Sequence, residues 1–499
     1  MSGAYDRNET TYDAFGRVSQ QSVPCLMSSC AAYWTTFSYD ALNRVTQMQR
    51  PVSASDSTLQ TTTTTYAGRT TTVTDPQGKQ TVKITTVAGT LGRLQDHNGY
   101  YQSFVYDAFG SLLSVSDSLL NQLMSATYDY GVRPFPRTLV DTDLGSRTMT
   151  YNALGELVNW SDGKDQSASA TYDALSRPLT RTEADLSTTW TWGNSAAAHN
   201  IGRLASVTAS SYQETYTYDS LGRPSSTSIT IPSDATYTYD TAYNSTTGLV
   251  DTLTYPTSTS SYRLKLQYSY QNGILRQISD FNAPGTVFWA ANATNARGQV
   301  TQETLGNGVV TNRVFDPVTG WLGSLQSGVG GGAALQNDSY AFDLVGNVTQ
   351  RQNNNAGLTE NFYYDNVYRL DHSTLGGTQN LALTYDGTGN ITSRSDVAGG
   401  ATWTYDPARK HAVTQAGAGG VSYTYDANGN VTSRNGATIS WTSFDHPSVI
   451  NSGTESVQFS YNHNHLRWRA IYSGSAGLET TYFIGGLLEK VITAGANDY

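Results

Sequence analysis

The sequence predicts an all-β fold in which one hairpin is repeated along the whole chain. Tyr-Asp pairs recur from Tyr5 to Tyr425, and the last four of them begin at positions 364, 385, 405 and 425. This period of about 20 residues leaves room for two strands of about seven or eight residues and two turns. Gly, Pro, Asn and Thr interrupt nearly every window that could hold a long amphipathic helix.

The repeating unit has a strand, a tight turn and a returning strand, as in YTYDANGNVTSR from Tyr423 to Arg434. Aromatic residues two positions apart share a strand face, so stacked hairpins align their rings into ladders. Asp opens the turn because its carboxylate accepts backbone N–H groups, and Gly supplies a positive φ. The predicted structural motif residues are Tyr12, Asp13, Gly16, Arg17, Tyr39, Asp40, Tyr172, Asp173, Tyr218, Asp219, Gly222, Arg223, Tyr385, Asp386, Gly389, Tyr425, Asp426 and Gly429.

The composition indicates a folded chain built in thin layers. Only 38% of the 499 residues are hydrophobic and 14% are charged, against typical values of about 45 to 50% and about 25%. Such a chain cannot fill a deep apolar core, but 34 Tyr and 9 Trp are too many rings for a disordered tail. Tyr suits a half-wet sheet face, where the ring packs and the hydroxyl reaches a polar partner.

Charge and hydropathy exclude several partners. The net charge is -10, and no Lys/Arg cluster offers the basic footprint that nucleic acid requires. No apolar run approaches the roughly 18 to 20 residues of a membrane span. The start, MSGAYDRNETTYDAFGRV, lacks the basic region and apolar core of a signal peptide and already carries the repeat. We therefore expect a chain cut within its repeats at both ends.

Among all-β architectures, a spiralling antiparallel sheet fits the repeat best. A single propeller would need roughly eleven blades, too many for one ring, although two propellers stay open. A sheet that grows hairpin by hairpin coils as its twist accumulates. Three Ser/Thr- or Gly-rich stretches, residues 58–66, 256–261 and 328–334, are interpreted as longer loops. We expect residues 1–499 to form a single domain.

The YDxxGRV units closely resemble the Rhs (YD-repeat) family, together with the segments Gln299–Gly328, Gly389–Val397 and YFIGGLLEKV from Tyr482 to Val491. That family includes polymorphic toxins of competing bacteria, the C subunits of insecticidal Tc toxins and, more distantly, teneurins. The resemblance covers essentially the whole chain. It implies repeats wound into a hollow β shell, here partial, that encloses a C-terminal toxic domain, and it implies a secreted or cell-surface protein.

The sequence also departs from that family. In the bacterial toxins a core-associated segment closes the shell and carries the Asp residues of a self-cleaving site near an Asp-Pro-x-Gly motif. This sequence stops at ITAGANDY, and no such segment or toxin domain is recognised in it. No catalytic aspartate is therefore assigned.

Two residue pairs could be taken for sites. His463 and His465 have the His-x-His spacing of some zinc sites, but no third ligand is visible nearby, so a polar hairpin turn is the favoured interpretation. Cys25 and Cys30 are the only cysteines. We interpret them as two small loop residues; a local disulfide would close a very short ring. No metal or cofactor is predicted.

The sequence favours no enzyme. Aspartates recur once per turn at a fixed offset, which turn capping explains, and no GxSxG, HExxH or phosphate-binding loop is present. Trp190 and Trp192 share a strand face and could form a sugar-binding platform, although packing against the adjacent hairpin is favoured.

Two functional hypotheses follow. The first is a shell segment that encapsulates and carries a C-terminal toxin domain or other protein cargo. The alternative is a teneurin-like adhesion module that binds a surface glycan or receptor.

Overall fold

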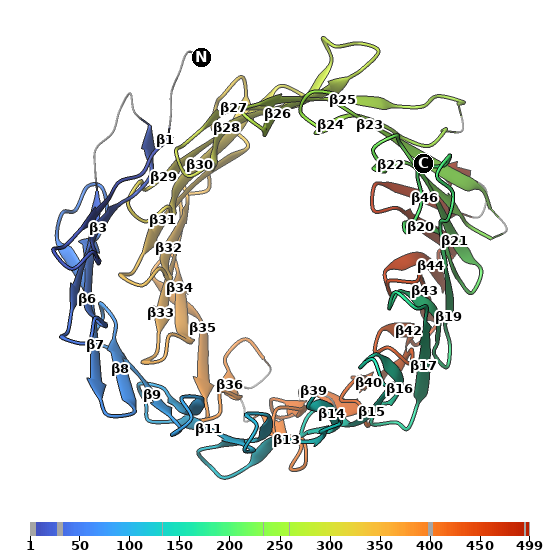
Figure 1. Cartoon of the computed structure of the whole chain (residues 1–499). Helices are drawn as coiled ribbons and strands as arrows, with labels where there is room; N and C mark the ends of the chain where they lie inside the picture. The colour runs from blue at the N-terminus through green and yellow to red at the C-terminus, as the bar shows by residue number, and fades with distance from the viewer. Residues whose placement is uncertain are drawn as a thin grey trace.

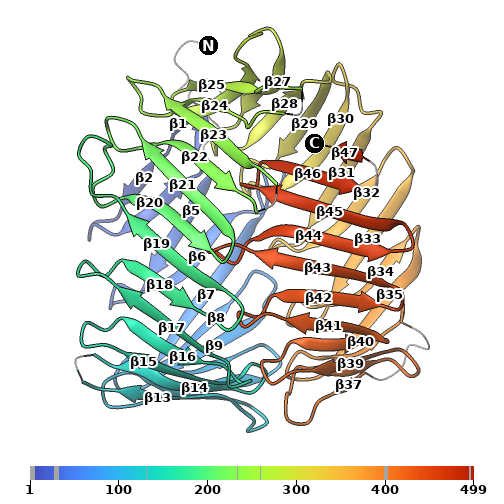
Figure 2. The same cartoon turned by 90° about the vertical axis from the view of Figure 1, so that its right-hand side faces the viewer.

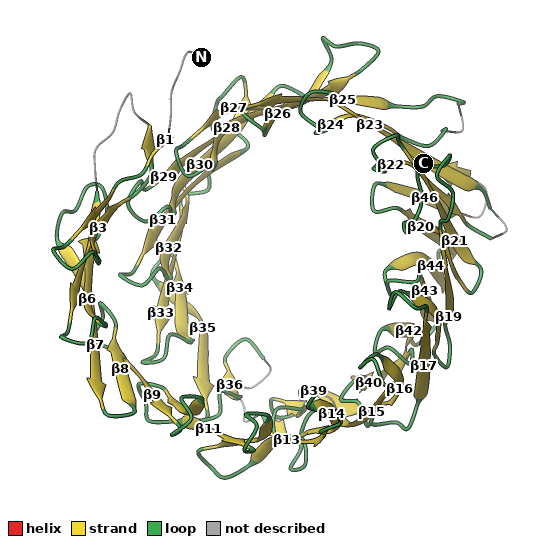
Figure 3. Cartoon of the chain, in the orientation of Figure 1, coloured by secondary structure: helices red, strands yellow, loops and turns green. Residues whose placement is uncertain are grey.

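The predicted all-β fold is confirmed. The computed structural model describes residues 6–26, 33–131, 133–232, 234–258, 260–397, 403–493 and 496–498, and every regular element in these ranges is a β-strand (Figure 3). The strands surround a central region that no described element crosses (Figure 1). The same ranges contain no helix with the length and apolar character needed to cross a membrane.

The strands are short and follow one another closely. The first are β1 (Asp6–Arg7), β2 (Thr10–Tyr12), β3 (Val18–Ser22), β4 (Cys25–Leu26), β5 (Trp34–Tyr39), β6 (Val45–Pro51), β7 (Leu59–Ala67), β8 (Thr70–Thr74), β9 (Gln80–Thr85), β10 (Leu91–Gln95), β11 (Tyr101–Tyr106), β12 (Leu112–Asp117), β13 (Gln122–Asp129), β14 (Phe135–Asp141), β15 (Gly145–Tyr151) and β16 (Leu157–Ser161). The next are β17 (Ser167–Tyr172), β18 (Pro178–Thr182), β19 (Ser187–Trp192), β20 (Leu204–Ala209), β21 (Tyr212–Tyr218), β22 (Pro224–Thr230), β23 (Thr236–Tyr243), β24 (Val250–Thr254), β25 (Lys265–Gln271), β26 (Ile274–Asp280), β27 (Val287–Thr294), β28 (Val300–Leu305), β29 (Val309–Phe315), β30 (Leu322–Val329), β31 (Gln336–Phe342) and β32 (Val348–Asn353). The last are β33 (Leu358–Tyr364), β34 (Leu370–Leu375), β35 (Thr378–Tyr385), β36 (Ile391–Arg394), β37 (Thr404–Tyr405), β38 (Val413–Ala416), β39 (Val421–Tyr425), β40 (Val431–Arg434), β41 (Ala437–Trp441), β42 (Pro447–Ser452), β43 (Glu455–Tyr461), β44 (Arg467–Gly474), β45 (Gly477–Ile484), β46 (Leu488–Thr493) and β47 (Ala496–Asp498).

The sheet grows by adding each strand antiparallel to the one before it. Pairing runs in sequence order from β2 and β3 through β5 and on to β36, and again from β37 to β47. Among the described strands no register joins β2 to β36, so this sheet is an open spiral. Trp403 directly precedes β37, and its backbone N–H donates to the carbonyl of Thr392 in β36 at 3.0 Å. This hydrogen bond connects the first run of strands to the second.

The Tyr-Asp turn is built around one carboxylate. In the turn at Asp13, Oδ1 accepts the backbone N–H groups of Phe15 (2.8 Å) and Arg17 (3.0 Å), and Oδ2 accepts Nε of Arg17 at 2.7 Å. Gly16 has φ 75° there, a conformation that favours glycine. The same contacts hold Asp40, where the backbone N–H and then the guanidinium of Arg44 lower the pKa of the carboxyl.

Each turn also contains a β-bulge at its tyrosine. Thr11 pairs with Gln20, but Tyr12 pairs with Val18, so the register shifts by one residue between Thr11 and Tyr12. The same shift recurs before Tyr39, Tyr172, Tyr218, Tyr385 and Tyr425. A bulge increases local twist and bends its strand, so bulges that recur at the Tyr-Asp turns curve the sheet in a regular way.

In many units an aromatic latch joins the unit to the one before it. The Tyr39 hydroxyl donates to the carbonyl of Val18 at 2.7 Å, and Val18 is the residue that pairs with Tyr12 across the preceding bulge. Equivalent latches are Tyr66 to Val45, Tyr128 to Leu112, Tyr172 to Leu157, Trp192 to Pro178, Tyr218 to Leu204, Tyr243 to Pro224, Tyr364 to Val348, Tyr385 to Leu370, Tyr405 to Ile391, Tyr425 to Val413, Trp441 to Val431 and Tyr461 to Pro447. Trp serves where Tyr is absent because its indole N–H donates in the same way.

The turn arginine packs on the same aromatic ladder. The Arg17 guanidinium lies 4.5 Å from the ring centre of Tyr39, and Arg223 lies 4.2 Å from that of Tyr243. Each arginine therefore pairs with the aspartate of its own turn and with the aromatic ring of the next unit. Turn, bulge and ladder form one connected structure.

The wall is thin. The chain exposes 26759 Å², whereas a compact monomer of 54.0 kDa would expose about 18,000 Å². Most described residues are only partly buried, and the buried hydrophobic cluster of the described residues gathers at one place, around Tyr212, Ile229, Tyr239, Trp468 and Ile484. A single layer of sheet with two accessible faces has this property.

Two expectations about local structure are wrong. Residues 58–66, expected to form a loop, lie almost entirely in β7, because a run of β-branched Thr suits a strand paired on both sides with β6 and β8. Cys25 lies in β4 and is disulfide-bonded, whereas we expected an unbonded loop residue. Cys30 lies outside the described residues.

The latch can be tested by removing one hydroxyl. We expect Tyr218→Phe to cost about 0.5 to 1.5 kcal/mol locally, since the Leu204 carbonyl loses its donor. Hydrogen exchange should speed up in β20 and β21 and stay unchanged in β33, because repeat arrays respond locally. Tyr12→Phe is the matched control, since its side chain is 63% exposed. Equal effects of the two substitutions would contradict the latch.

Candidate functional site

Two successive coils of the spiral meet along a seam. We call residues 10–254 the first coil and residues 265–493 the second coil, and Figure 2 shows their hairpin ends meeting side by side. Each coil has a YD edge, which carries the Tyr-Asp turns, and a return edge, which carries the turns between units. The YD edge of the second coil packs against the return edge of the first, through contacts between residues 245 to 298 positions apart.

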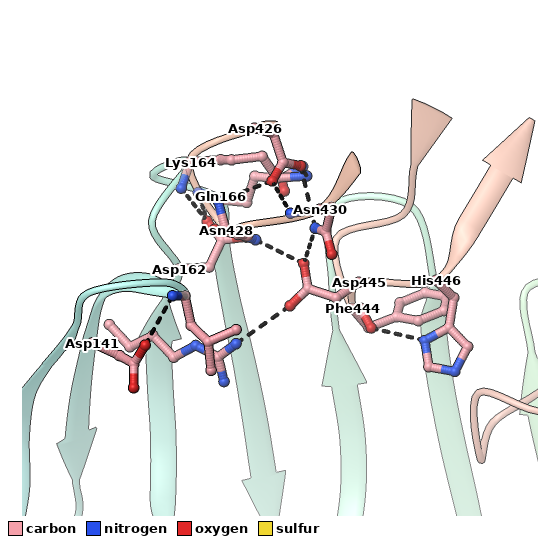
Figure 4. Close-up of polar contacts among 12 residues, drawn as sticks. Asp141, Asp162, Lys164, Gln166, Asp426, Asn428, Asn430, Phe444, Asp445 and His446 are labelled. Carbon is pink, nitrogen blue, oxygen red and sulfur yellow. Dashed lines mark hydrogen bonds and ion pairs between the residues drawn. The ribbon is translucent and has the colours of Figure 1, made fainter. Parts of the chain in front are cut away.

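A polar cluster lies in the middle of this seam (Figure 4). Asn428, in a turn of the YD edge, donates through Nδ2 to Asp162 of the return edge at 2.6 Å and to Asp445 at 2.8 Å. Lys164 of the first coil lies 3.3 Å from the Asp426 carboxylate of the second. Asn428 is 1% exposed, so its amide is buried between the two coils.

Glycine lets the backbones approach closely beside this cluster. A Cβ at Gly163 would lie 2.6 Å from the carbonyl oxygen of Ala427, and one at Gly145 would lie 2.3 Å from the same oxygen. From the other coil, a Cβ at Gly429 would lie 2.3 Å from the carbonyl oxygen of Asp143. Side chains at these positions would force the two edges apart.

A second group of charges lies further along the seam. Arg181 donates through Nη2 to the carbonyl of His463 at 2.8 Å, and its Nε lies 2.9 Å from Glu183. His465 Nε2 lies 3.1 Å from Glu183 and 2.8 Å from Arg181. Burial lowers the pKa of His463, which favours its neutral form inside the seam. Within the described ranges no group of three or more His, Cys, Asp or Glu could hold a metal ion.

The far end of the seam is apolar. Tyr212, Ile229 and Tyr239 of the first coil pack against Trp468, Tyr482 and Ile484 of the second. The Tyr239 hydroxyl donates to the carbonyl of Ile484 at 2.8 Å, and Lys490 forms an ion pair with Asp234. The largest buried cluster of the described residues therefore stabilises the seam.

A cleft of about 380 Å³ opens between the polar cluster at Asp162 and the group of charges around Arg181. Met149, Trp160 and Phe444 form its apolar part. Its charged groups face one another across the seam, as in the 3.4 Å contact between Arg147 and Asp445. The arrangement holds two edges together, and its charged groups are paired with one another.

The motif residues predicted from the sequence lie in the Tyr-Asp turns. The tyrosines at 12, 39, 172, 218, 385 and 425 end strands β2, β5, β17, β21, β35 and β39. Gly16, Gly222, Gly389 and Gly429 have φ between 70° and 99°. The turns at Asp386 and Asp426 lie on the YD edge of the second coil, whereas those at Asp13, Asp40, Asp173 and Asp219 lie on the free YD edge of the first.

The two residue pairs considered as sites have other roles. His463 and His465 lie in the hairpin turn between β43 and β44, as the repeat predicts, and they contact the first coil. The Trp192 indole donates to the carbonyl of Pro178 at 2.9 Å, and Arg177 lies 4.9 Å from the Trp192 ring centre. Arg181 lies 5.7 Å from that of Trp190. Packing against the preceding hairpin, the favoured interpretation, is confirmed for both tryptophans.

Sequence reasoning missed the seam residues. Asn428 occupies the turn position where other units carry a large apolar residue such as Leu175 or Leu221. This departure was a usable signal of a polar contact. Gly163 and Asp162 gave none, because turns ordinarily contain both residue types.

Known proteins have sequences and folds similar to this one. The family model of the teneurin YD-shell matches residues 96–326. The predicted resemblance to YD-repeat proteins is confirmed. A TcdB2-TccC3-Cdc42 crystal structure superposes with a TM-score of 0.81 at 16% identity, over 98% of this chain and 29% of that chain. A TcdB2-TccC3 structure gives 0.78 at 17% identity, with 98% and 30% covered.

The Photorhabdus luminescens Tc holotoxin pore gives a TM-score of 0.77 at 16% identity, with 98% of this chain and 29% of that chain covered. These likenesses show that the fold is a YD shell. The chain spans less than a third of the length of the structures it matches. No curated protein matches the sequence.

The seam can be tested with one methyl group. Gly163→Ala places a Cβ against the Ala427 carbonyl, and we expect overpacking to cost about 1 to 3 kcal/mol and to increase hydrogen exchange in β16, β17 and β39. Gly285→Ala is the control, since a Cβ there meets nothing within 4 Å and neither glycine has a positive φ. A seam that tolerates Gly163→Ala as well as the control would show that close backbone approach is unnecessary.

Proposed function

We propose that this chain is a wall segment of a secreted YD-repeat shell that encloses and carries a protein cargo. Residues 1–499 form one shell domain in this proposal. The observation that carries it is the large exposed area, 26759 Å² against about 18,000 Å² for a solid protein of this mass. A wall needs two accessible faces, and this sheet supplies them in a single layer.

The seam supports a container. A spiral sheet encloses a space only if successive coils stay joined, and here buried side chains join them from Asn428 to Ile484. Polar contacts around Asn428 and Arg181 are followed by apolar contacts around Ile484, and these specific pairings fix the register of one coil on the next. A sheet that only presented a binding site on its surface would not need contacts along the whole seam.

The proposal of a toxic cargo rests on the family resemblance. The matched structures are of Tc toxin assemblies that contain TccC3, and one also contains Cdc42. By analogy, the cargo of this shell is a toxic C-terminal domain, and the protein acts outside the cell that makes it. The proposal assigns the wall no catalytic role.

The adhesion hypothesis stays a prediction. Its motivation was the surplus of aromatic residues, yet the structure engages Trp190 and Trp192 with the neighbouring hairpin. A surface glycan or receptor would therefore need another platform.

Cargo protection tests the proposal. We would extend the chain beyond Tyr499 with an unstructured, trypsin-sensitive peptide and follow its cleavage. Enclosure predicts slow cleavage in the intact wall and fast cleavage when Gly163→Leu opens the seam, with Gly285→Leu as the matched control. Circular dichroism would confirm that each variant is folded. Equally fast cleavage in all three proteins would contradict enclosure.

A further inference from the structure

A row of apolar side chains lies on the free YD edge of the first coil. Six successive Tyr-Asp turns, or their equivalents, carry a large apolar residue that is between 45% and 77% exposed. These residues are Phe109, Tyr130, Leu154, Leu175, Ile201 and Leu221. Successive turns on one edge are two strands apart, about 10 Å, so the side chains form a continuous line. This YD rim faces away from the second coil on the left of Figure 2.

The equivalent position is buried where it meets a return edge. In four of these turns the residue lies two positions after the Asp or Asn that opens the turn and donates its N–H to that side chain. These residues are Phe109, Leu154, Leu175 and Leu221. In the second coil the same position is held by Val318 and Asn428, which are 2% and 1% exposed, and by half-buried Val345 and Val367. One turn position is therefore covered along the seam and uncovered along the YD rim.

The opposite rim of the molecule has the features of a return edge. The free return edge of the second coil, on the right of Figure 2, carries open turns at Gly308, Gly357 and Gly436, where a Cβ would meet nothing within 4 Å. It also exposes Val329 and Leu335. The first coil meets its neighbour through the same kind of edge, where Gly145 and Gly163 admit the opposing backbone. We call this free edge the return rim.

We propose that the YD rim is a docking surface for the return rim of a second copy of this chain. The two rims belong to the same two edge types that form the internal seam, so the contact continues an interface the molecule already uses. The apolar row supplies the area to be buried, and the open glycine turns let the opposing backbone come close. The two copies contribute different rims, so the contact is head-to-tail and leaves one rim of each kind free. This inference is independent of any cargo.

Sedimentation velocity over a concentration series tests the docking. Docking predicts that the unmodified chain forms concentration-dependent, end-to-end species, and that these are lost when the YD rim is made polar. The YD-rim variant combines Leu154→Gln, Leu175→Gln and Leu221→Gln. The matched control combines three substitutions of exposed residues within strands, Val105→Gln, Val314→Gln and Tyr363→Gln, and should associate as the unmodified chain does.

Mixing two variants tests the head-to-tail geometry. A return-rim variant, Val329→Gln with Leu335→Gln, should be monomeric alone, as should the YD-rim variant. Their mixture should form a heterodimer, because each retains the rim that the other lacks. An unmodified chain that stays monomeric at every concentration, or a YD-rim variant that associates as the control does, would overturn the proposal. A mixture without heterodimer would also overturn it.

Discussion

The recurring hydrogen bond from a Tyr or Trp side chain to the bulge carbonyl of the preceding unit is the contact on which the wall depends. A hairpin joined to the next only by its strands could slide or flatten, because a thin sheet has little core to resist it. The latch prevents both movements. It ties the Tyr39 hydroxyl to Val18 and the Tyr425 hydroxyl to Val413, and so aligns the bulges of successive units. Aligned bulges bend the sheet in one direction, which makes a coil from a ribbon.

The seam then turns the coil into a wall. Its contacts are few compared with those within the sheet, but they include the buried amide of Asn428 and the cluster around Tyr239 and Ile484. Burying polar groups such as these is costly unless each finds a partner, so the seam tolerates one register and excludes others. Latch and seam have different tasks. The latch sets the curvature of one coil, and the seam sets how one coil lies on the next.

Much of this architecture could be predicted from the sequence, for a physical reason. The repeat makes local chemistry visible, so Tyr, Asp and Gly at fixed spacing are enough to indicate a capped turn and an aromatic ladder. The threonines of β7 were misleading, because their composition suggested a loop where strand pairing decided the structure. The seam could not be predicted. Which turn meets Gly163 depends on the twist accumulated between Asp162 and Asn428, and a small change per strand would bring another turn to that place.

The most direct test of a hollow wall is small-angle X-ray scattering of the monomer, separated by size-exclusion chromatography in the same experiment. A solid protein of 499 residues has a radius of gyration of about 23 Å. A thin spiral wall places its mass far from its centre, so the account predicts a radius well above that value and a pair-distance distribution shifted to long distances. A radius of about 23 Å with a symmetric distribution would show a filled molecule and would contradict the shell.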